Sequence, residues 1–115
     1  MISTVEDYVK FLEALRIGDI ILQSETIELM YTNQLSGEQL KFYWLIGSGY
    51  GLGVRCAKVP GEDTYFGWGG AAGAYPLIDR KHNVTFFYAK HVLNTDNDYQ
   101  NIPMKDFFVN ELCRG

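Results

Sequence analysis

The sequence is poor in several residue types that mark common classes of protein. It contains only two cysteines, Cys56 and Cys113, too few for a disulfide framework or a cysteine-based metal motif, so we expect free, buried thiols. Ten lysines and arginines stand against 14 aspartates and glutamates, giving a net charge of -4, and no basic run occurs. This balance argues against nucleic acid or an anionic membrane surface as the main partner.

Long apolar runs are also missing, because no segment approaches the roughly 18 residues that a membrane-spanning helix requires. The first residues, MISTVED, have neither the basic region nor the apolar stretch of a signal peptide. Together with the few cysteines, this favours an intracellular location. The 115 residues suit a single domain spanning 1–115, and 47% hydrophobic content with 15% aromatic residues is not typical of a disordered chain.

Two helices are predicted in the first third of the chain. Residues 3–15 form the first, with Ser3 and Glu6 as a capping box and Gly18 as the stop. Its apolar face is made by residues at helical spacing, namely Val5, Tyr8, Val9, Leu12 and Leu15. Ser24 is predicted to cap a second helix over 25–31, with Ile27 and either Met30 or Tyr31 facing inward.

The middle of the chain predicts strands. Residues 33–39 are expected to be a polar loop, and 40–46 either a strand or a packed connector. Strands are predicted at 50–58 and 64–70, and a hairpin at 74–79 and 84–92, closed over residues 80–83.

Pro103 is placed to start a last helix, in which Phe108 and Leu112 share one side. The order of elements predicts an α+β fold, with an antiparallel sheet of three to four strands and helices packed on one face.

Several possible sites have simpler interpretations. Residues 67–72 have the letters of a dinucleotide fingerprint, but a proline-containing strand follows them where the fingerprint requires a helix. The alternating glycines in 47–53 are typical of a strand entry that another backbone approaches closely. His82 and His91 lack acidic or thiol partners at ligand spacing and are expected to be solvated. The polar side of the first helix, with Glu6, Asp7 and Glu13, is expected to be solvated too.

A recognisable catalytic motif is also missing. No serine is followed three residues later by lysine, no Gly-x-Ser-x-Gly occurs, and no cysteine–histidine pair stands out. A nucleophile must have a base beside it to react, so the residues alone predict no catalysis. No metal or cofactor is expected either.

Five segments, in order, resemble the C-terminal part of the serine β-lactamase-like hydrolases, which include class C β-lactamases, D-Ala-D-Ala carboxypeptidases and family VIII-type esterases. ISTVEDYVKFL (2–12) and LQSETIELM (22–30) resemble two helices of that family, and YGLG (50–53) resembles one of its strands. FGWGGAAG (66–73) resembles its third active-site motif in the esterase-like form. Residues 79–88 resemble the strand pair that closes its sheet.

The resemblance assigns roles to the glycine-rich segment. Trp68, Gly69 and Gly70 stand where the family has the strand that forms one wall of the substrate groove. The backbone N–H of Ala71 stands where the family has an oxyanion donor. The alternative is a bulged strand that packs under a helix. Trp68 replaces the lysine that receives a β-lactam carboxylate, so an esterase or peptidase-like activity on a small ester or amide is implied.

The family's Ser-x-x-Lys nucleophile and Tyr-x-Asn base lie upstream of its third motif and have no counterpart here. Tyr31-Thr32-Asn33 has the letters of the base motif, but it ends a helix close to Trp68, and we interpret it as a coincidence. The expectation is a C-terminal fragment of such a hydrolase, inactive alone, whose partner is the missing N-terminal half or a second copy. The alternatives are a non-catalytic binding or structural domain and one half of a split enzyme.

Overall fold

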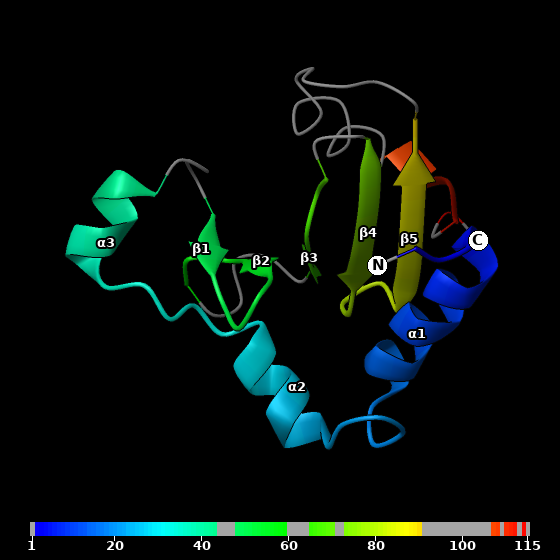
Figure 1. The fold of residues 1–115 in the computed structure, drawn as a ribbon, viewed down its shortest axis with the longest axis horizontal. Coiled ribbons are helices and arrows are strands. Elements are labelled where there is room, and N and C mark those ends of the chain that lie inside the picture. The colour runs from blue at the N-terminus through cyan, green and yellow to red at the C-terminus, as the bar shows by residue number, and fades with distance from the viewer. Residues whose placement is uncertain are drawn as a thin grey trace.

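The computed structural model describes residues 2–43, 48–59, 65–70 and 73–90, together with 107, 108, 110, 111, 112 and 114. Three helices precede one antiparallel sheet with the strand order β1-β2-β3-β4-β5 (Figure 1). The predicted α+β class is confirmed, but the sheet has five strands. The elements are α1 (Val5–Ile17), α2 (Ser24–Met30), α3 (Gly37–Phe42), β1 (Gly49–Tyr50), β2 (Arg55–Cys56), β3 (Tyr65–Gly67), β4 (Ala74–Asp79) and β5 (Val84–Ala89).

Helix α1 begins one residue later than the capping box predicted. The Thr4 hydroxyl accepts a hydrogen bond from the Asp7 N–H at 3.2 Å, so Thr4 is the N-cap. Ser3 instead donates its hydroxyl to the Thr4 carbonyl. The helix ends at Ile17, two residues after the predicted end, and Gly18 follows with φ +82°. Gly18 is therefore the stop, as predicted.

The start of α2 is capped from the preceding loop. Asp19 lies in the left-handed region with φ +58° and accepts hydrogen bonds from the Ser24 N–H at 2.8 Å and the Ser24 hydroxyl at 2.9 Å. The bond from the Ser24 N–H is the larger cause of the lowered pKa of Asp19. Ser24 is thus the first residue of α2 and not its N-cap. The Asp19 side chain ties down one of the amides that a helix start leaves without an internal partner.

The last three residues of the predicted polar loop form the start of helix α3. The Ser36 side chain accepts from the Gln39 backbone, and the Gln39 side chain accepts from the Ser36 N–H at 2.8 Å. This capping box starts a helix that runs from Gly37 to Phe42, so the predicted loop is correct for 33–36 and wrong for 37–39. The strand option for 40–46 is wrong for its first residues, which complete α3. Residues 44–47 lie outside the described ranges.

The predicted strand 50–58 is a hairpin of two short strands. Gly49 pairs with Cys56 and Tyr50 with Arg55, and the Gly51 N–H donates to the Val54 carbonyl at 2.9 Å. Gly53, with φ +83°, makes the reversal possible. A Cβ on Gly51 would lie 1.8 Å from the Met30 carbonyl oxygen, which confirms the predicted close approach of another backbone.

The β4–β5 hairpin is confirmed, with residues 80–83 as its turn. Strand β5 ends at Ala89, and the rest of the predicted strand, except Lys90, lies outside the described residues. His82 is not simply solvated, because its Nδ1 lies 3.0 Å from an oxygen of the buried Asp79 carboxylate. The same carboxylate accepts the His82 N–H at 3.2 Å, so Asp79 holds the turn together.

Helical residues lie on both faces of the sheet, not on one as predicted. Tyr8 of α1 packs against Phe87 with 5.5 Å between ring centroids, and Phe108 packs against Phe86 on the opposite face at 6.0 Å. Residues 107, 108, 110, 111 and 112 are helical, while Pro103 lies outside the described residues. The α1 face carries the core, formed by Leu12, Leu15, Ile27, Cys56, Phe66 and Ile78.

Cys56 is a free, buried thiol, as predicted, and burial raises its pKa. Cys113 lies outside the described residues. Within the described ranges, no helix has the length and apolar character needed to cross a membrane.

The two edge strands of the sheet, β1 and β5, differ in length. Strand β1 has two residues and β5 has six. The Lys90 N–H donates to the Gly73 carbonyl, so the backbone groups of Thr85, Phe87 and Ala89 point away from β4. Strand β5 contains no charged residue and no proline, which commonly keep an edge strand from pairing with another chain.

Glu13 was expected on a solvated face but links α1 to the β4–β5 hairpin. Its carboxylate accepts the Arg16 side chain at 2.7 Å and the Thr85 hydroxyl, while Arg16 also donates to the Asn83 side chain. The hydrogen bond from Arg16 is the largest cause of the lowered pKa of Glu13. A lowered pKa adds stability above the ordinary value of 4.5, and this stability is lost as the pH falls through the folded-state pKa.

We expect Glu13→Gln to lower the free energy of unfolding by about 1 kcal/mol at pH 7, because a charge-assisted network becomes a neutral one. The difference should shrink between pH 7 and pH 3, because the wild-type carboxyl gains a proton as the pH falls through its folded-state pKa. Urea unfolding of both proteins at the two pH values measures it. Glu6→Gln is the control, since the Glu6–Lys10 pair is exposed and should contribute little. An equal loss at both pH values would contradict a role for the Glu13 charge.

Candidate functional site

The candidate site begins where β3 leaves the regular sheet. Phe66 pairs with Ile78 and Gly67 with Leu77, so the next pair in this register would be Trp68 with Pro76. Proline has no N–H to donate to a neighbouring strand, and β3 ends at Gly67, three residues before the predicted end. Contact with β4 resumes where the Gly70 N–H donates to the Ala74 carbonyl at 2.8 Å. Pro76 therefore interrupts the ladder at the start of Trp68-Gly69-Gly70, the WGG segment.

Close backbone contacts require two of the glycines around this segment. A Cβ on Gly67 would lie 2.2 Å from the Pro76 carbonyl oxygen. Gly73 has φ +96°, and a Cβ there would lie 2.0 Å from the Lys90 carbonyl oxygen. The Gly73 N–H also donates to the Gly70 carbonyl at 2.9 Å. The glycine-rich composition is thus explained at both ends of the WGG segment by geometry that a side chain would disrupt.

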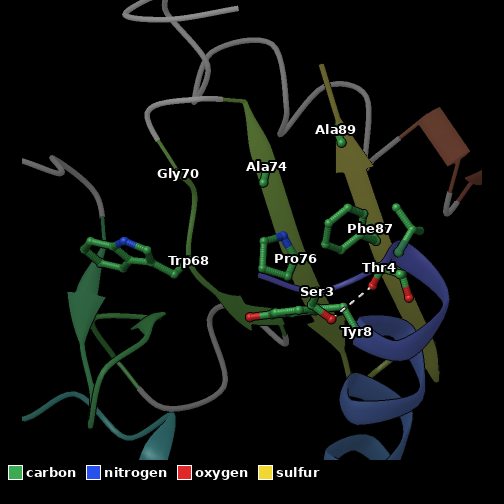
Figure 2. Close-up of a pocket in the computed structure, with 10 residues that line it drawn as sticks. Ser3, Thr4, Tyr8, Trp68, Gly70, Ala74, Pro76, Phe87 and Ala89 are labelled. Carbon is green, nitrogen blue, oxygen red and sulfur yellow. Dashed lines mark hydrogen bonds between the residues drawn. The ribbon is translucent and has the colours of Figure 1, made fainter. Parts of the chain in front are cut away.

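A groove of about 400 Å³ opens beside this segment (Figure 2). One wall comes from the start of α1 and the residues before it: Ser3, Thr4, Val5 and Tyr8. The other wall comes from the sheet and the WGG segment: Trp68, Gly70, Ala74, Pro76, Phe87 and Ala89. Of the residues predicted for the site, Trp68 and Gly70 line the groove. Gly69 is not among its lining residues, and Ala71 lies outside the described residues.

Aromatic packing holds the two walls in place. The Trp68 ring makes a T-shaped contact with the Tyr50 ring at 5.7 Å between centroids. Trp68 nevertheless remains 38% exposed. Tyr8 packs against Phe87 and also makes a T-shaped contact with Phe11 at 5.8 Å. Both rings that border the opening are therefore supported from behind by other side chains.

A family model described as Beta-lactamase matches residues 1–109, most of the chain. The chain belongs to the beta-lactamase family. No curated protein gives a significant match to it. The resemblance seen in the sequence is thus confirmed at the level of the family.

The groove of this beta-lactamase-family chain has a chemistry suited to binding. None of the described residues that line it carries a carboxylate, an imidazole, a thiol or an amine. The Ser3 hydroxyl donates to the Thr4 carbonyl at 3.3 Å, and among the residues that the structure describes no base lines the groove beside it (Figure 2). Within the described ranges, no three histidine, cysteine, aspartate or glutamate residues come together to hold a metal ion. The groove can hold a ligand, but an activated nucleophile requires a neighbouring base.

The residues that resemble the Tyr-x-Asn motif of the beta-lactamase family have structural contacts. The Tyr31 ring stacks on Phe66 at 4.9 Å, and its hydroxyl accepts from the Arg80 side chain at 2.8 Å. The Asn33 side-chain oxygen accepts from the N–H groups of Leu35 and Tyr50, both at 3.1 Å. These contacts support the interpretation of the motif as a coincidence.

Sequence reasoning did not place Tyr8, Phe87 or Pro76 at the site. Tyr8 was assigned to the inward face of a helix, and Phe87 to one strand of a hairpin. Helical and strand periodicity predicts which side of an element is covered, but not which other element covers it. Pro76 was the one available signal, because a proline inside a strand marks a position where the ladder cannot continue.

Proposed function

We propose that this chain supplies one wall and one oxyanion donor of a β-lactamase-like serine hydrolase with esterase or peptidase-like activity. The observation that carries the proposal is that the WGG segment of a beta-lactamase-family chain borders an open groove, and that the described residues lining this groove have no charged side chain. Substrate would lie along Trp68 and Gly70, and the N–H of Ala71 would donate to the oxyanion. Such a donor is typically worth about 3 kcal/mol of transition-state stabilisation.

Catalysis needs two further groups that this chain does not provide. Its 115 residues contain no Ser-x-x-Lys, and the described groove contains no base. We therefore propose that the nucleophile and base come from another segment of a beta-lactamase-like polypeptide, as in a complete enzyme or a split one. An oxyanion donor without a nucleophile stabilises an intermediate that does not form. By itself, the chain would be a binding module.

Exposed apolar side chains support an interaction with such a segment. Five large apolar residues of the α1–α2 region are between 37% and 62% exposed: Ile17, Ile20, Ile21, Leu22 and Leu29. Exposed apolar surface of this kind is common where a protein contacts a partner. The partner would be the complementary half of the hydrolase, or a second copy where that half is missing.

The proposal predicts that ester hydrolysis appears only on mixing. The pure chain should hydrolyse 4-nitrophenyl acetate no faster than buffer does. Mixing it with a family segment that carries Ser-x-x-Lys and Tyr-x-Asn, but ends before its own third motif, should raise the rate about 100-fold above that of the segment alone. Absorbance of released 4-nitrophenol measures the rate, and a serine-directed phosphonate should abolish it.

The matched control is the same segment with its nucleophilic serine changed to alanine, which should bind this chain and give no rate. An acyl adduct on a serine of the pure chain would contradict the division of roles. A stable complex that shows no hydrolysis would favour the alternative of a non-catalytic binding domain.

A further inference from the structure

We infer that the groove between residues 3–8 and the sheet, which Trp68 and Tyr8 both line, accepts an uncharged aromatic ester group with the Tyr8 hydroxyl as hydrogen-bond donor. This inference rests on the proposed function, because it names the class of substrate that the same site would take. Its test uses binding to the chain alone, so it can fail or succeed independently of hydrolysis.

Two aromatic residues, Trp68 and Tyr8, line the groove. In Figure 2, Trp68 comes from the segment after β3, and Tyr8 extends from α1 across the sheet near Pro76. Both residues line the 400 Å³ groove and also a second, smaller cavity of about 130 Å³. In the same view the Trp68 ring points away from Tyr8, so a ligand in the groove would contact the Tyr8 side chain and meet Trp68 at the margin of the groove.

The described lining residues carry no charge. Among them there is no cation that could balance a carboxylate, and Pro76 and Phe87 add apolar surface. Transferring an ion into such a site without a partner is unfavourable, whereas a neutral ester keeps most of its binding energy. The groove should therefore discriminate between an ester and the acid of the same shape.

The Tyr8 hydroxyl is the group that would bind the polar end of the ligand. Within the part of the chain that the structure describes, the Tyr8 hydroxyl makes no hydrogen bond, and Tyr8 is only partly buried. A phenol that lines an apolar groove and keeps a free proton can donate to an ester oxygen. Small-molecule sites commonly combine apolar walls with a few placed polar groups, and their volumes begin at about 300 Å³.

Ethyl benzoate and benzoate at pH 7.5 are the probes. In a Trp44→Phe background Trp68 is the only tryptophan, and the NMR resonance of its indole N–H reports occupancy. Ethyl benzoate should give a saturable shift with a Kd on the order of millimolar, and benzoate should bind at least about tenfold more weakly. Tyr8→Phe should weaken ethyl benzoate binding about threefold to tenfold.

Tyr88→Phe is the matched control. Tyr88 lies on the opposite face of the sheet, since it pairs with Tyr75, and its loss should leave binding unchanged. A gain-of-function variant guards against misfolding: Ala74 is exposed and lines the groove, so Ala74→Lys adds a cation there and should raise benzoate affinity about tenfold.

Benzoate binding as tight as ethyl benzoate, undiminished binding in Tyr8→Phe, or no saturable shift would each overturn the inference. If ethyl benzoate binds as expected and mixing gives no hydrolysis, the proposed function fails while the binding site stands. If mixing gives hydrolysis and the probes do not discriminate, the reverse holds.

Discussion

Ile27→Ala is expected to lower the free energy of unfolding by about 2–5 kcal/mol. Ile27 is 1% exposed and is the only residue of α2 that is buried. It packs into the cluster that joins α1 to Phe66 and Ile78 of the sheet. Deleting three carbons there removes transfer free energy and leaves a cavity, and α2 loses its anchor. The loss is comparable to much of the 5–15 kcal/mol that stabilises a typical domain.

Urea unfolding followed by circular dichroism measures this effect. The control is Leu29→Ala on the same helix, because Leu29 is 55% exposed and its change should stay within about 0.5 kcal/mol. Similar shifts in the two variants would mean that α2 does not pack through Ile27.

Ala71→Pro is expected to reduce the hydrolysis rate of the mixed system by about 100- to 1000-fold. Proline lacks the N–H that we assign to the oxyanion, while the groove walls keep their side chains. The effect should fall on kcat, since the donor contacts charge that develops only in the transition state. The kinetic parameters for 4-nitrophenyl acetate measure it.

Ala72→Pro is the matched control, because it introduces the same ring next door and keeps the Ala71 N–H. It should retain most of the rate. If both variants lose activity equally, the cause is a disturbed segment, and if neither loses activity, the donor is a different group. Binding of ethyl benzoate by both variants would show that the groove itself is intact.

Local patterns predicted the elements whose formation depends on neighbours in sequence. The helical spacing of Leu12 and Leu15 and the alternating strands around the 80–83 turn led to α1 and the β4–β5 hairpin with small errors at the ends. One error arose because a side chain five residues away decides where a helix starts: Asp19 caps the helix whose first residue is Ser24.

Half of the groove could be predicted, and for a specific reason. Trp68 and Gly70 belong to a contiguous motif, which a resemblance between sequences can detect. Tyr8 reaches the same groove from 60 residues earlier in the chain, through packing on Phe87 that no local pattern encodes. The polar contacts of Glu13 with Thr85 were missed for the same reason, because they span 72 residues.

The unequal margins of the sheet limit how copies of this chain can assemble. Along β5, the backbone groups of Thr85, Phe87 and Ala89 point away from β4, whereas β1 at the other edge has only two residues. When two β5 strands meet antiparallel, each occupies the other's open side, and only the short margins face outward. We therefore expect any pairing through the sheet to give a closed dimer and not a fibre, because the two-residue β1 edges would offer little to a further copy.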